Sequence, residues 1–167
     1  GTARGEPTLR SPISGEPVLA YHLIIEEERG PTRWRRVVDR REAGDFWIDD
    51  EHGSVRVSAG TGKQLSLDAR ERRGKCGPFR SPPRRVAWLI GQQRTDVYGV
   101  LFGKAFRWRE QVLLPGEPVD VRAHAVERLA ESGASRYREA PREIVLSGSP
   151  GSPIEVVALP NAKRIAI

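Results

Sequence analysis

The stretch AGTGKQ, residues 59–64, is the part of the chain that most resembles a phosphate-binding loop. Such a loop has a glycine five residues before its second glycine, and a serine or threonine follows the lysine to bind Mg²⁺. Val57 and Gln64 occupy these two positions here. The stretch therefore suits a plain hairpin turn better than a nucleotide site.

The histidines and the acidic residues do not form a recognisable catalytic or metal pattern. His22, His52 and His124 are far apart and share no metal-ligand spacing. A serine–histidine–aspartate triad would depend on the fold alone, because no nucleophile elbow is present. The acidic residues 49–51 could hold a hard cation, but their spacing is not that of an EF-hand and suits a solvated hairpin tip. We therefore expect no enzyme activity, no cofactor and no metal.

The strongest chemical signal is a local excess of positive charge. The chain has 28 basic and 22 acidic residues, a net charge of +6, and residues 70–85 hold seven of the basic residues and one of the acidic ones. The rest of the chain is balanced, with 21 of each. A basic patch attracts the phosphates of lipids or nucleic acids, and the alternative is a solvated loop. The candidate anion contacts are Arg70, Arg72, Arg73, Lys75, Arg80, Arg84 and Arg85.

Alternation of apolar and polar residues indicates that antiparallel strands carry these groups. Residues 54–58, 64–72 and 118–126 place valine, leucine or alanine at every second position, the last run with Val119 to Ala125 facing inward. Turn sequences rich in glycine and proline separate the runs. We expect a mainly β, antiparallel fold, either a partly open barrel or two packed sheets, with one to three short helices.

The best helical segment is residues 83–92, in which Pro83 suits the first turn and Val86, Leu89 and Ile90 share one face. A second short helix is expected near Glu127.

A hairpin loop is expected at residues 30–31, between a glutamate-rich run and an arginine-rich run. Pairing in which residue numbers sum to about 61 would place Glu26 near Arg35 and His22 near Asp39. Opposite charges in such pairs contribute about 0.2–1 kcal/mol each.

Four segments, read in order, are similar to one known family. They are SPISGEPVLAYHLIIEEE, TRWRRVVDRREAGDFWIDDEHGSVRV, EQVLLPGEPVDVRAHA and IVLSGSPGSPIEVVAL. Together they resemble the GIDE domain, also called the BAM (beside-a-membrane) domain, of the membrane-anchored E3 ubiquitin ligases GIDE or MULAN and of many bacterial and archaeal membrane proteins. The resemblance implies one domain at residues 9–159 between tails at 1–8 and 160–167. It also implies that the stiff lead-in, residues 11–17, turns the chain away from a bilayer into the first strand.

The sequence departs from this family in ways that limit the function. Family members often have a cysteine after the lead-in proline, where Val18 stands here. The ligases also carry a RING domain, which a chain with Cys76 as its one cysteine cannot contain. We therefore do not expect ubiquitin transfer from this chain. Its arginine-rich composition suggests a bacterial member, and the absence of methionine suggests either a processed product or a piece of a longer protein.

These observations lead to a non-catalytic, membrane-proximal sensing or scaffolding domain. It would be membrane-associated in its parent protein and soluble as this fragment, because no stretch reaches the apolar length of a transmembrane helix. Its partner would be a membrane surface, a membrane protein or a small ligand. The alternative is an OB-like module that binds single-stranded nucleic acid, which exposed tryptophans beside a basic groove would favour and buried ones would weaken. A deep pocket with converging histidine, serine or carboxylate groups would instead indicate an enzyme.

Overall fold

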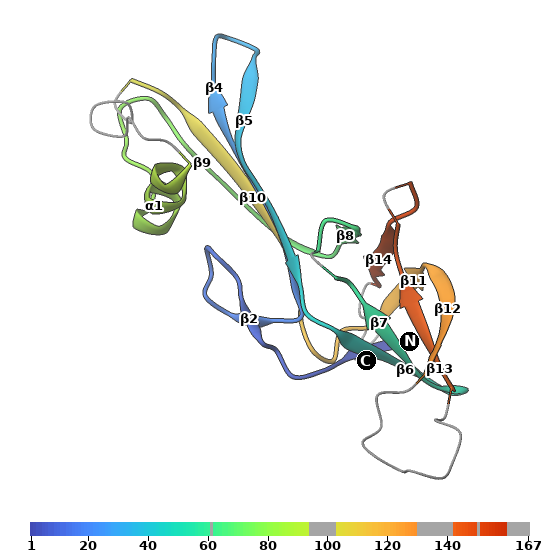
Figure 1. Cartoon of the computed structure of the whole chain (residues 1–167). Coiled ribbons are helices and arrows are strands. Elements are labelled where there is room, and N and C mark those ends of the chain that lie inside the picture. Colours follow the sequence, from blue (N-terminus) through green and yellow to red (C-terminus); the bar gives the residue numbers. More distant parts are fainter. Residues whose placement is uncertain (61, 94–102, 130–141, 150, 160–167) are drawn as a thin grey trace, which may run out of the picture.

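The computed structural model describes residues 1–60, 62–93, 103–129, 142–149 and 151–159. In this part of the chain the strands form four sheets, accompanied by one helix, α1 (Arg84–Gln92). Eight of the ten described pairs of neighbouring strands are antiparallel and two are parallel, and the sheets do not close into a barrel. The expected mainly β fold is confirmed (Figure 1).

The sheets are arranged as follows. The five-stranded sheet has the order β1 (Thr2–Arg4), β6 (Phe46–Asp50), β7 (Gly53–Ser58), β13 (Arg142–Ser147), β12 (His124–Leu129). The four-stranded sheet has the order β5 (Trp34–Ala43), β4 (Ala20–Glu28), β10 (Phe106–Leu113), β9 (Arg70–Cys76). The three-stranded sheet has the order β11 (Val119–Arg122), β14 (Ile154–Ala158), β8 (Leu65–Asp68), and β2 (Leu9–Arg10) pairs with β3 (Pro17–Val18).

Two apolar clusters divide the molecule into two connected halves. One cluster lies between the five- and three-stranded sheets and includes the fully buried Phe46 and Val119. The other lies between the four-stranded sheet and α1 and includes Tyr21 and Phe106. Figure 1 shows the four-stranded sheet extending away from the other sheets, with α1 on one of its faces. The second cluster therefore fixes which face of this sheet stays open.

The predicted helix is confirmed almost residue for residue. α1 begins directly after Pro83, and its buried residues are Val86, Leu89 and Ile90, as the 3.6-residue periodicity indicated. Among the described residues, no helix is long and apolar enough to span a bilayer.

Three other expectations were wrong. The second helix near Glu127 is instead β12, because residues 124–129 pair with β13. The inward pattern of residues 118–126 fails at Ala125, which is exposed, because β11 ends at Arg122 and β12 joins a different sheet. In the AGTGKQ stretch the Gly62 amide donates to the Ala59 carbonyl at 3.0 Å, but the stretch links β7 and β8 of two different sheets rather than closing a hairpin.

The N-terminal residues also differ from the expected tail. Residues 2–4 form β1, which pairs antiparallel with β6 and packs the fully buried Ala3 into the core. The chain is therefore already part of the folded body before it reaches the lead-in at residues 11–17. The lead-in accordingly cannot be where the chain first enters the fold. Residues 160–167 lie outside the described part of the chain.

The β4–β5 hairpin has the expected charge pattern in a shifted register. Near the loop, Glu26 lies opposite Arg36 rather than Arg35, and farther along His22 lies opposite Arg41. A bulge between the two regions shifts the register by one residue. His22 and Asp39 nevertheless meet diagonally, with Nε2 and Oδ1 2.9 Å apart.

The lead-in is the loop of the β2–β3 hairpin, and it is fixed by hydrogen bonds. Within it, the Gly15 amide donates to the Ser11 carbonyl at 2.9 Å, and Gly15 has a φ of 76°, which favours glycine. The Arg85 guanidinium on α1 donates to the Ile13 carbonyl at 2.9 Å. The Ile13 amide donates to Glu110 Oε1 on β10 at 2.8 Å. The lead-in therefore joins the sheet to the helix.

Replacing Glu110 with alanine should lower the free energy of unfolding by about 1–2 kcal/mol, because the Ile13 amide would lose its acceptor. Glu110 is fully buried, and its Oε2 has no hydrogen-bond partner among the described residues. Glu110→Gln keeps an acceptor at Oε1 and serves as the control. Denaturant midpoints should rank wild type near Glu110→Gln and above Glu110→Ala. Equal midpoints for the two variants would show that the Ile13 contact contributes nothing.

Candidate anion-binding face

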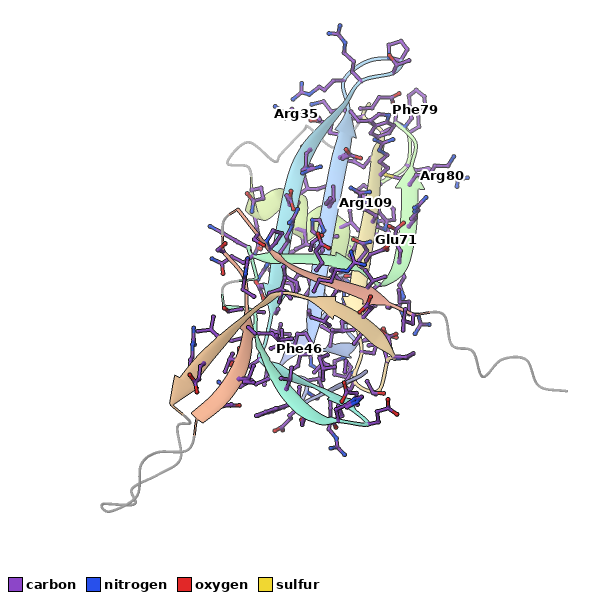
Figure 2. All side chains as sticks on the ribbon, turned by 90° about the vertical axis from the view of Figure 1, so that its right-hand side faces the viewer. Arg35, Phe46, Glu71, Phe79, Arg80 and Arg109 are labelled. Carbon is purple, nitrogen blue, oxygen red and sulfur yellow. The ribbon has the colours of Figure 1, made fainter. Side chains whose placement is uncertain are left out.

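The face of the four-stranded sheet opposite α1 is open and strongly charged. Successive side chains of a strand alternate between faces, so the side chains between the core residues of β10 and β9 point away from the helix. On β10 these are Arg107 and Arg109, and on β9 they are Arg73 and Lys75, all four of them exposed. Figure 2 views this face, with α1 behind the sheet and Arg109 labelled near its centre.

These four residues form what we call the cation square. Arg107 lies directly opposite Lys75, and Arg109 lies directly opposite Arg73. Residues directly opposite in an antiparallel pair have Cβ atoms about 4.5–5.5 Å apart, and like charges in that position are destabilising. Two consecutive like-charge pairs therefore lower the stability of the fold, so stability does not explain why they are present.

Acidic neighbours compensate only half of this charge. Arg107 Nε lies 2.6 Å from Glu26 Oε2, and its guanidinium is 4.4 Å from the centroid of the Trp34 ring. Arg73 pairs with Glu71 on its own strand. Lys75 and Arg109 form no ion pair or side-chain hydrogen bond with any described residue. They are the two cations of the square that remain available to an external anion.

Other cations at this end of the sheet serve the fold instead. The carboxylate of Glu27 is fully buried, and Arg29, Arg35 and Lys104 approach it at 3.2, 3.1 and 2.7 Å respectively. A buried carboxylate requires such partners. These three side chains therefore serve to neutralise the buried Glu27 carboxylate.

The open face contains a shallow hollow of about 580 Å³ over the square. Its lining comprises Glu26, Arg73, Gly74, Lys75, Arg107, Trp108 and Arg109.

His22 lies on the same face but does not add to its charge. Burial, assisted by the nearby cations Arg41 and Arg109, lowers the pKa of His22 despite the opposing effect of Asp39. The imidazole is therefore neutral at pH 7, and it stands 2.9 Å from Asp39 as a structural pair.

The segment at residues 70–85 is not the solvated loop that its composition allowed. It is a strand, a turn and the start of a helix, so its seven cations lie on different surfaces. Arg73 and Lys75 belong to the cation square. Arg70 and Arg72 alternate with them toward the helix side, where Arg72 lies 2.7 Å from Glu16.

The remaining candidates lie farther from the open face. Arg80 lies in the exposed turn after β9, and Arg84 and Arg85 begin α1. Arg85 donates to the lead-in and is structural.

Sequence reasoning missed Arg107 and Arg109, which supply half of the square. The signal was present in FRWREQ, residues 106–111, where arginine or glutamine alternates with phenylalanine, tryptophan and glutamate.

No family model, curated protein or solved structure matches this chain. Within the described residues, no group of three or more histidine, cysteine, aspartate or glutamate side chains is placed to hold a metal ion.

Proposed function

We propose that this domain is a non-catalytic, membrane-proximal sensing or scaffolding module that docks on an anionic lipid surface through the cation square. One observation carries the proposal: two directly opposed pairs of like charge, Arg107–Lys75 and Arg109–Arg73, stand on an open sheet face. A bound anion would relieve the repulsion that the fold otherwise tolerates. The resemblance to the GIDE domain supports the same setting, beside a membrane in a parent protein.

The exposure of the cations on this face supports a surface as the partner. Arg73 and Arg107 have side-chain exposures of 79% and 48%, so the guanidinium groups reach solvent while their strands stay fixed. Each cation close to an anionic leaflet contributes about 1 kcal/mol. The two uncompensated cations alone would then supply about 2 kcal/mol of attraction.

A single nucleic-acid strand would meet the same cations, but it would also require rings on which bases stack. Arg107 lies over the Trp34 ring, and the Trp108 ring lies against Gly74. The more exposed Trp88 is on α1, on the opposite side of the sheet from the square. Phe79 is the one fully exposed ring among the described residues at this end of the sheet, and a single ring offers little to a strand of stacked bases. The cations therefore favour a lipid surface over nucleic acid.

Co-sedimentation with vesicles tests the proposal. The protein should bind phosphatidylcholine vesicles that contain phosphatidylglycerol and should not bind pure phosphatidylcholine vesicles. Binding should weaken strongly between about 0.1 and 1 M salt, because the Debye length falls from about 10 to 3 Å. Equal binding to both vesicles would contradict the proposal. Tighter binding to single-stranded DNA, measured by fluorescence anisotropy, would favour the nucleic-acid function.

A further inference from the structure

A second hollow adjoins the first at the end of the sheet, and its lining is different. It has a volume of about 890 Å³ and is bordered by the aromatic side chains Trp34, Phe79 and Trp108 together with Lys75 and Arg80. The two hollows share Gly74, Lys75 and Trp108. A cationic hollow and an aromatic hollow therefore meet at Lys75.

Gly74 makes this junction possible. A Cβ atom on Gly74 would lie 2.3 Å from Trp108 Cζ2, a distance that real Cβ atoms do not show. The absence of a side chain thus lets the Trp108 ring lie against β9, and Gly74 and Trp108 are both among the residues that line the two hollows. Any other residue would displace the ring.

Phe79 is the most exposed large apolar side chain of the described residues, at 90%. It lies in a defined turn, in which the Arg80 amide donates to the Gly77 carbonyl at 3.2 Å and the Gly103 amide donates to the Pro78 carbonyl at 2.9 Å. Figure 2 shows Phe79 and Arg80 at the end of the sheet that also carries Arg35. An aromatic ring held in water beside cations is the pairing found where proteins meet lipid headgroups.

We infer that the two hollows together bind one molecule of anionic lipid. Its phosphate would contact Lys75 and Arg80 on the β9 side of the second hollow. The β4 side is unsuitable, because the carboxylate of Glu28 lines it and would repel the phosphate. Its acyl chain would lie along Trp34, Phe79 and Trp108. This inference rests on the proposed function and adds a site for a single lipid to a contact with a charged surface.

Titration with a short-chain lipid below its micelle concentration tests the site without a bilayer. Dihexanoyl phosphatidylglycerol should give saturable binding to the full chain by isothermal titration calorimetry. Dihexanoyl phosphatidylcholine, which has no net charge, and inorganic phosphate, which has no acyl chain, should each bind at least about tenfold more weakly. Inorganic phosphate binding as tightly as the lipid would overturn the acyl-chain part and leave an anion site only.

The variant Phe79→Ser should weaken dihexanoyl phosphatidylglycerol binding about tenfold, because burial of the ring is lost. Trp88→Ser, which removes an aromatic ring that is 60% exposed on α1, should leave the affinity unchanged and is the matched control. Equal affinities for the two variants would overturn the inference. Vesicle binding without any monomeric lipid binding would also overturn it, while leaving the proposed function in place.

Discussion

Replacing Gly74 with alanine should lower the free energy of unfolding by about 1–3 kcal/mol, since the new Cβ would displace the Trp108 ring. The sign is the opposite of the usual one, because alanine normally stabilises a strand relative to glycine by about 0.5–1 kcal/mol. The reason is local: three atoms of the Trp108 ring lie within 2.3–2.7 Å of the Cβ position. Urea denaturation of the wild type and the variant measures the difference.

Two controls separate the Trp108 contact from a general effect of glycine. Gly77, three residues later, has no atom within 4 Å of its Cβ position, so Gly77→Ala should be neutral or slightly stabilising. In a Trp108→Leu background, the cost of Gly74→Ala should largely disappear, which a double-mutant cycle would record. A cost that persists in this background would contradict the proposed role of Gly74.

The sequence was informative wherever a local pattern decides the structure. The helical face of Val86, Leu89 and Ile90 was readable because α1 buries one stripe and exposes the rest. The alternating run at residues 54–58 was readable as a strand for the same kind of reason, since one side faces the core and the other faces water.

Only half of the cation square was predicted from the sequence, because the site depends on pairing between segments that are distant in the chain. β9 contains RERRGKC, which has no apolar face of its own, and it is a strand because β10 supplies its hydrogen-bonding partner. Which cations face each other is set by this register, and local composition cannot reveal it. The same limitation explains why the role of Gly74 was missed, since its reason is a tryptophan that lies 34 positions away in the chain.

The bulge in β4–β5 shows how one residue changes such a prediction. The loop sets Glu26 opposite Arg36, where the sequence suggested Arg35. The irregularity between Ile25 and Glu26 then adds one more residue, so that His22 lies opposite Arg41 rather than Arg40. Bulges depend on how the sheet twists over its core, which is a property of the whole fold. The sequence therefore predicted that glutamates would pair with arginines in this hairpin, but it did not predict which residues lie opposite each other.

The double variant Lys75→Ser, Arg109→Ser should bind anionic vesicles more weakly than the wild type and should be more stable, because the cation square lowers stability and binds anions. It removes the two cations that have no acidic partner among the described residues, and with them both like-charge pairs. Affinity for phosphatidylglycerol-containing vesicles should fall about thirtyfold, at about 1 kcal/mol for each cation. The thermal midpoint should rise, because each relieved pair returns about 0.2–1 kcal/mol.

The matched control is Arg70→Ser, Arg84→Ser, which removes the same charge from two exposed side chains outside the square. Vesicle co-sedimentation of the wild type and the two double variants is the most direct test, and thermal unfolding of the same three proteins accompanies it. Only the Lys75, Arg109 variant should lose binding, and this variant should be more stable than the wild type. Equal loss of binding in both double variants, or a Lys75, Arg109 variant that is less stable than the wild type, would contradict this prediction.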